Sequence, residues 1–114
     1  MSDKDITHLK QMLDFAQRAH RRISGMSIES FLSNDDLQDM VLYAMGQVGE
    51  NANAISDETR NKHPELLWGP IIGIRNRIFH SYGHIDMSIV YEAAVEHVPI
   101  IITQVETILA DAAK

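Results

Sequence analysis

The chain has 114 residues and is acidic, with 16 Asp and Glu against 10 Lys and Arg and a formal net charge of -6 at pH 7. This length predicts one domain over residues 1–114, in which pairing with a second copy would help to bury apolar surface. The absence of cysteine excludes disulfides, thiolate metal sites and a cysteine nucleophile. The acidic balance argues against a broad basic surface that binds nucleic acid non-specifically.

The first residues and the hydropathy pattern bear on location. Residues 1–5 are polar and lack the apolar run of a secretory signal. No segment is apolar over the roughly 20 residues that a membrane-spanning helix needs. We therefore expect a cytoplasmic protein that is not bound to a membrane.

The first half of the chain carries apolar residues at three- and four-residue steps, as amphipathic helices do. We expect one helix over residues 5–26, ending near Gly25, and a second that follows Asn34 or Asp35 as its cap. The polar residues 56–64 that follow contain at most one capped turn, at Ser56. The two expected apolar stripes are Ile6, Leu9, Leu13, Ala16 and Ile23, then Leu37, Met40, Val41, Ala44, Met45, Val48, Ala52 and Ile55.

A third helix is expected from Glu65 to His80. Pro70 lies within its first turns and either marks the true start of the helix or kinks it. Trp68 is expected to anchor this entry in the core rather than to stack on nucleic-acid bases. The expected apolar face of the helix is Leu67, Ile71, Ile74 and Ile78.

The last third of the chain predicts a kinked pair of helices. Asp86 can cap a helix over residues 87–97, and Pro99 introduces a kink before residues 100–113. No strand or repeat is apparent in the sequence. The expected fold class is therefore all-α, an up-and-down bundle of four to five helices.

Residues 75–82, RNRIFHSY, are the most informative stretch for chemistry. Arginine offers a fixed fork of donors that fits phosphate, and histidine exchanges protons near neutral pH, so the stretch indicates phosphodiester chemistry. Arg75 and His80 would stand about 140° apart around one helix. They can meet at one phosphate only if the helix ends near His80, as Gly83 predicts, or if a second copy of the motif contributes.

A purely structural interpretation of the same residues stays open. In it, Arg75 and Arg77 are solvated or ion-paired, and His80 is a satisfied histidine at a helix end. A second basic cluster on the first helix is either a local RNA contact or a solvated face. It consists of Arg18, His20, Arg21 and Arg22.

Residues 73–82, GIRNRIFHSY, resemble the signature of the HepT-like proteins, a branch of the HEPN superfamily. In that family an Arg, usually followed by Asn, precedes a His by five positions, and a Tyr follows two residues later. The chain matches this pattern at Arg75, Asn76, His80 and Tyr82.

The resemblance extends over residues 5–112 and includes two features outside the motif. Gly49 and Glu50 stand where the family often has a Gly-Glu pair, and Trp68 stands where it has a Trp before the motif helix. One departure is Leu67, since the family commonly has Pro immediately before that Trp. The departure concerns the entry to the helix and not the motif itself.

The resemblance implies an endoribonuclease, the toxin of a HepT–MNT toxin–antitoxin pair, whose substrate is an mRNA or a tRNA. RNA carries a nucleophile in its own 2′-hydroxyl, so such an enzyme needs a base, an acid and charge stabilisation but no metal ion or other cofactor. In the related family the two motifs of a homodimer face one another across the twofold axis. One cleft would then hold two arginines and two histidines.

The resemblance also implies a role for each motif residue. His80 would transfer protons, Arg75 would stabilise the phosphate, Asn76 would orient His80 or hold the substrate, and Arg77 would bind RNA. Tyr82 would receive AMP from the partner MNT-type nucleotidyltransferase, which silences the toxin. The alternative interpretation of Tyr82 is a packing residue whose hydroxyl is satisfied.

Two other functions stay open. One is a non-catalytic module that presents a nucleotide or substrate to a separate nucleotidyltransferase, although the complete Arg–His–Tyr set favours the enzyme. The other is a metal-binding bundle, which the lack of paired Glu-x-x-His repeats disfavours. Its candidate ligands are His63, His80, His84 and His97 with Glu50 or Glu96.

Overall fold

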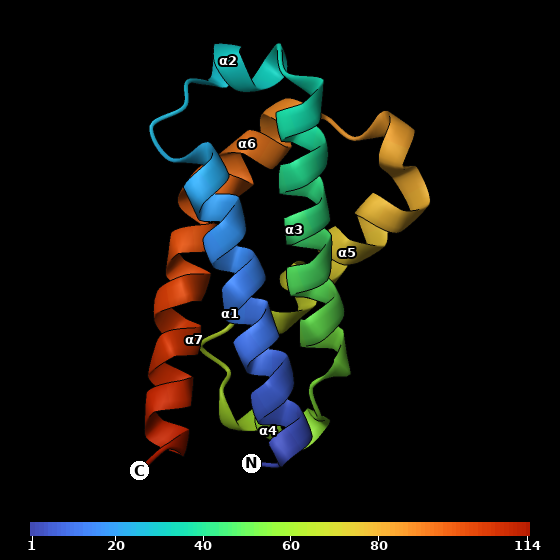
Figure 1. The fold of residues 1–114 in the computed structure, drawn as a ribbon. Helices are drawn as coiled ribbons and strands as arrows, with labels where there is room; N and C mark the ends of the chain where they lie inside the picture. The colour runs from blue at the N-terminus through green and yellow to red at the C-terminus, as the bar shows by residue number, and fades with distance from the viewer.

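The part of the chain that the structure describes folds into seven α-helices and one 3₁₀ turn (Figure 1). The computed structural model describes residues 1–114 apart from the side chain of Tyr82. The elements in chain order are α1 (Asp3–Ile23), α2 (Ile28–Leu32), α3 (Asp35–Ala54), α4 (Asp57–Lys62), α5 (Trp68–Ser81), η1 (Tyr82–His84), α6 (Met87–Glu96) and α7 (Val98–Ala112). The described chain holds five helices of ten or more residues, so the expected all-α bundle is confirmed.

Three long helices, α1, α3 and α7, run side by side and enclose most of the core (Figure 1). Helices α2 and α6 close one end of this bundle, while α4 closes the other end beside both chain termini (Figure 1). Helix α5 packs mainly on α3, at the side of the bundle. No single described helix is long and apolar enough to cross a bilayer, and α6 and α7 reach that length only as a pair bent by 41°.

Side-chain caps set the starts of the helices. Asn34, Ser56 and Asp86 accept hydrogen bonds from backbone N–H groups at the beginnings of α3, α4 and α6, as expected. These caps satisfy donors that have no partner within the helix. After α1, Gly25 takes a φ of +75°, a conformation that favours glycine and turns the chain toward α2. The predicted break near Gly25 and the predicted cap at Asn34 are therefore confirmed, whereas the first helix runs over Asp3–Ile23 instead of residues 5–26.

Two details of the predicted apolar faces are wrong. Met40 was expected in the core, but 44% of it is exposed because the stripe on α3 is wider than the surface that α1 and α5 cover. Leu67 precedes α5 and is 64% exposed, whereas its neighbour Leu66 is buried.

Helix α5 begins at Trp68 instead of Glu65, so Pro70 falls in the first turn, where its missing N–H costs no helical hydrogen bond.

A close approach between α3 and α5 positions the motif helix. A Cβ atom placed on the buried Gly49 would lie 2.5 Å from the Cβ of Arg75 and 2.9 Å from the carbonyl oxygen of Ile71. Only a residue without a side chain lets the two backbones come this near. Trp68 fixes the start of α5, because its ring is buried and its Nε1 donates to the carbonyl of His63 at 2.9 Å. The expectation that Trp68 is a core anchor is confirmed.

A buried carboxylate joins α1 to α4 at the end of the bundle near the termini. Asp5 is 3% exposed and accepts hydrogen bonds from the backbone N–H of Ser56 at 3.0 Å, the Ser56 hydroxyl at 2.6 Å and the Thr59 hydroxyl at 2.5 Å. Burial raises the pKa of Asp5, but these hydrogen bonds outweigh it and leave the pKa below its ordinary value. The folded protein therefore stabilises the ionised form of Asp5.

We expect Asp5→Asn to lower the free energy of unfolding at pH 7 by about 1–3 kcal/mol, since the hydroxyl donors lose a charged acceptor. Because the folded pKa is lowered, the stabilisation is complete above the unfolded pKa of about 3.8 and fades as the pH falls through the folded value. Urea unfolding of both proteins from pH 7 down to pH 2 should show the difference shrinking below pH 4. Asp3→Asn, at an exposed aspartate of the same helical turn, is the control; a gap that widens in acid would contradict the assignment.

Candidate functional site

The motif lies on the exposed side and at the end of one continuous helix. Helix α5 runs to Ser81, so His80 stands in its last turn as expected. Arg75 and His80 are part of the same helix and point about 140° apart around its axis. Within one chain they therefore face different directions, and the helix end does not bring them onto one phosphate.

Arg75 is the best-positioned polar side chain of the motif. Its Nε donates to Oε2 of Glu50 on α3 at 2.6 Å, and its Nη1 donates to Oδ1 of Asn76 at 2.7 Å. Its guanidinium carbon also lies 5.1 Å from the centre of the Phe79 ring. Two hydrogen bonds and one ring contact therefore fix the plane of the guanidinium.

The guanidinium keeps donors for a ligand. An arginine carries five N–H groups, and the bonds to Glu50 and Asn76 use two of them. The side chain of Arg75 is 27% exposed, so the remaining donors are within reach from solvent. The Glu50 carboxylate, 44% exposed, offsets part of the positive charge but leaves the fork oriented. Such an arrangement suits the binding of a phosphate group.

The other motif residues surround Arg75 differently. Asn76 is exposed and its described bond is to Arg75, not to His80. His80 is exposed and makes no hydrogen bond with the described side chains, which leaves its ring available for a ligand. Arg77 points to the opposite side of α5 from Arg75, where it borders a shallow apolar hollow with Ile89 of α6. The side chain of Tyr82 lies outside the described residues.

The basic cluster on α1 is partly neutralised. Arg18 forms an ion pair with Asp14 at 2.8 Å and lies 4.8 Å from the centre of the Phe15 ring. Arg21 and Arg22 are exposed in the last turn of α1, where cations interact favourably with the helix dipole. The structure thus supports a solvated, ion-paired face for Arg18 at least.

The candidate metal ligands do not converge. Among the described residues, no group of three or more His, Asp or Glu side chains is arranged to hold a metal ion. His63 instead lies 3.2 Å from the carboxylate of Glu65, and Glu50 is engaged by Arg75. Within the described chain, the candidate ligands therefore lie apart from one another.

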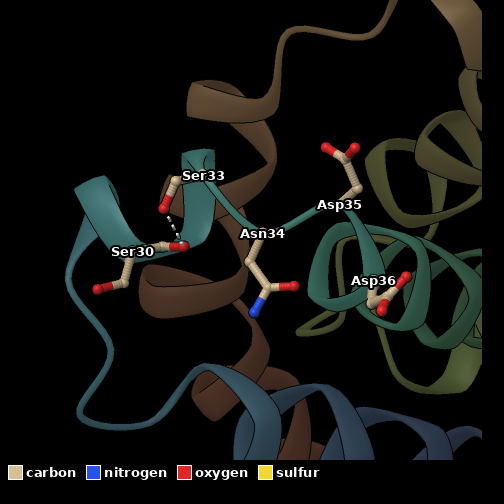
Figure 2. Close-up of a pocket in the computed structure, with 5 residues that line it drawn as sticks. All are labelled: Ser30, Ser33, Asn34, Asp35 and Asp36. Atoms are coloured by element: carbon tan, nitrogen blue, oxygen red, sulfur yellow. Dashed lines mark hydrogen bonds between the residues drawn. The ribbon is translucent and has the colours of Figure 1, made fainter.

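A polar hollow lies away from the motif, where α2 meets α3 (Figure 2). Its lining includes Ser30, Asp35 and Asp36, and the two carboxylates do not converge on a common point. The oxygen of Asn34 that could serve a ligand already caps α3. Two carboxylates without an opposing cation repel phosphate, so this hollow is a poor site for RNA.

The sequence offers Glu50 as a candidate metal ligand but does not indicate its contact with Arg75. The Gly49-Glu50 pair was visible in the sequence, but the bond from Arg75 to Glu50 joins residues on two helices. The signal that could have found it is the glycine itself, since a buried glycine inside a helix often marks a close approach of another backbone.

The chain is similar to known proteins along most of its length. A model of the family described as "Ribonuclease HepT-like" matches residues 12–108. A "Putative RNase" of Caldanaerobacter subterraneus subsp. tengcongensis is 26% identical over 102 residues, which is 90% of this chain and 91% of that protein. A "Putative RNase" of Methanocaldococcus jannaschii is 28% identical over 109 residues, covering 95% and 100% of the two chains.

A third relative carries a more specific name. The "Probable ribonuclease HepT" of Thermococcus cleftensis is 27% identical over 71 residues, which is 62% of this chain and 64% of that protein. No solved structure matches the chain significantly.

Proposed function

Because the chain belongs to the HepT-like ribonuclease family, we propose that it is a metal-independent endoribonuclease. In this proposal it is the toxin of a HepT–MNT toxin–antitoxin pair and cuts mRNA or tRNA in the cytoplasm. The observation that carries this proposal is the guanidinium of Arg75, held by Glu50 and Asn76 with donors to spare, on the same helix as the exposed His80. The relatives named as RNases support the substrate class.

The proposed reaction uses the 2′-hydroxyl of RNA as nucleophile. A histidine takes the proton of that hydroxyl, and the 2′-oxygen forms a bond to the adjacent phosphorus. The bond from phosphorus to the 5′-oxygen breaks, and a second proton donor protonates the leaving 5′-oxygen. Arg75 stabilises the negative charge that builds up on the phosphoryl oxygens. The products are a 2′,3′-cyclic phosphate and a 5′-hydroxyl.

We propose that two copies of the chain complete the site, with His80 as base in one and as acid in the other. The angle between Arg75 and His80 on α5 supports this arrangement, because one helix cannot direct both at one phosphate. Gly69 and Gly73 stand on the same outward face as Asn76 and His80, and a Cβ atom at either glycine would meet no described atom within 4 Å. Such a face allows a second α5 helix to approach closely across a twofold axis.

Cleavage in the presence of EDTA tests the proposal. Purified protein should cut single-stranded RNA in EDTA at the same rate as without it, and the fragments should end in a 2′,3′-cyclic phosphate, because the 2′-hydroxyl is the nucleophile. An RNA with a 2′-deoxyribose at the cut site should resist. Loss of cleavage on chelation that a divalent ion restores would contradict the mechanism, and RNA binding without cleavage by any preparation would favour a non-catalytic module.

We further propose that a partner MNT-type nucleotidyltransferase silences the enzyme by attaching AMP to Tyr82. Tyr82 follows His80 by two residues, so the added phosphate would lie near Arg75 and compete with RNA phosphate for its donors. Incubation with the partner and ATP should add AMP to Tyr82 by mass spectrometry and stop cleavage, whereas Tyr82→Phe should escape. AMP mapped to Tyr43 or Tyr91 instead would remove Tyr82 from the switch.

A further inference from the structure

An apolar groove runs between α3 and α5 beside the motif. Its volume is about 400 Å³, within the range of roughly 300–1,000 Å³ of pockets that hold small organic ligands. The buried residues Leu42, Gly46 and Ile78 form its floor. Two aromatic residues at its edge, Tyr43 and Phe79, are 60% and 54% exposed. Exposed aromatic residues therefore flank an apolar floor.

The two aromatic residues are held in place by their neighbours. The ring of Tyr43 packs edge-on against Phe15 of α1 at a centroid distance of 5.8 Å. Phe79 is held from the other direction, because the guanidinium of Arg75 lies over its ring. Rings fixed in this way lose little conformational freedom when a ligand stacks on them.

The groove has charged groups of opposite sign at its two ends. Arg75 lies over Phe79 at one end, with N–H donors that Glu50 and Asn76 do not use. Asp39 borders the other end, one turn before Tyr43 on α3. A ligand that combines a flat apolar ring with a phosphate would place the phosphate toward the unused donors of Arg75.

We propose that this groove binds one nucleobase of the RNA substrate, stacked on Tyr43 and Phe79, while the adjoining phosphate contacts Arg75. This inference rests on the proposed ribonuclease function and adds a subsite to it. Bases stack on aromatic side chains without regard to sequence, and only unpaired bases can leave their own stack to do so. The enzyme should therefore prefer single-stranded RNA, with little preference for the base next to the cut.

A nucleotide fits the groove better than the apolar face of a protein. An apolar surface laid over Phe79 would cover the guanidinium of Arg75 and leave its remaining donors without acceptors, which is costly. A nucleotide supplies phosphate oxygens for those donors and a ring for the groove at the same time. The polar Gln47, which also borders the groove, can serve the edge of a base.

Binding of two matched probes to Tyr43 variants tests the inference. The first probe is a single-stranded 2′-O-methyl RNA, which cannot be cut, and the second is a base-free oligomer with the same phosphate spacing. Tyr43→Ala should weaken binding of the RNA about tenfold or more and leave the base-free oligomer unaffected, whereas Tyr43→Phe should bind like the wild type. Leu67→Ala, at another exposed apolar side chain outside the groove, is the control.

Each other outcome overturns the inference. Equal binding of the RNA by wild type and Tyr43→Ala, or equal weakening of both probes, would show that no base stacks on Tyr43. If Tyr43→Ala weakens binding only where sedimentation shows that it dissociates into single chains, the groove is an interface between copies. If the wild-type protein binds and cuts RNA and Tyr43→Ala binds RNA equally well, the subsite alone is refuted. If the wild-type protein binds neither probe, the proposed function is refuted as well.

Discussion

Replacing either Arg75 or His80 by alanine should reduce the rate of RNA cleavage at least about 100-fold. His80 is the exposed group of the motif that can move protons, and Arg75 is the cation that the fold orients. Both side chains lie at the surface of α5, so the far-ultraviolet circular dichroism and the thermal midpoint should change little. Rates are measured on a labelled single-stranded RNA under single-turnover conditions.

Matched variants separate these roles from general effects. His84→Ala removes an exposed histidine four residues further on and should leave the rate unchanged. Arg75→Lys keeps the charge but cannot bond Glu50 and Asn76 as a fixed fork, so it should recover only a small part of the activity. Arg77→Ala should weaken RNA binding with little effect on the rate at saturation. Full activity of His80→Ala would refute the acid–base assignment, and a strictly monomeric protein that still cuts RNA would refute the two-copy site.

Most helices could be predicted because local chemistry decides them. The caps at Asn34, Ser56 and Asp86 and the break just before Pro99 follow from neighbouring residues, and the structure contains each of them. The exposure of Met40 could not be predicted in the same way. A stripe of apolar residues shows which face of a helix can be buried, but the width of the buried arc depends on which helices pack there.

The site could be predicted only in part for the same reason. The motif follows from the sequence, and the angle between Arg75 and His80 follows from helical geometry. Helix α5 includes both residues, as predicted. The bond from Arg75 to Glu50 depends on the packing of α5 on α3. The contact between Arg75 and Asn76 is also unexpected, since side chains one residue apart on a helix do not usually face one another.

Replacing Gly49 by alanine should destabilise the protein, although alanine is normally the better helix residue by about 1 kcal/mol. The new Cβ would lie 2.5 Å from the Cβ of Arg75 and 2.9 Å from the carbonyl oxygen of Ile71, so the backbone of α5 would have to move away from α3. Forcing such an overpacked contact typically costs about 1–3 kcal/mol. After the gain in helix propensity, we expect a net loss of up to about 2 kcal/mol in the free energy of unfolding, measured by urea titration.

Gly46→Ala is the matched control, three residues earlier on the same helix. A Cβ at Gly46 would lie 3.7 Å from the nearest atom of Ile78, which is an ordinary contact, so this variant should gain up to about 1 kcal/mol from helix propensity. Gly49→Ala should also cut RNA at least about tenfold more slowly where it is still folded, because moving α5 lengthens the 2.6 Å bond from Arg75 to Glu50 and frees the guanidinium. If Gly46→Ala and Gly49→Ala were equally stable, the contact at Gly49 would not limit how closely α3 and α5 approach each other. If Gly49→Ala were less stable but cut RNA at the wild-type rate, the orientation of Arg75 by Glu50 would not contribute to catalysis.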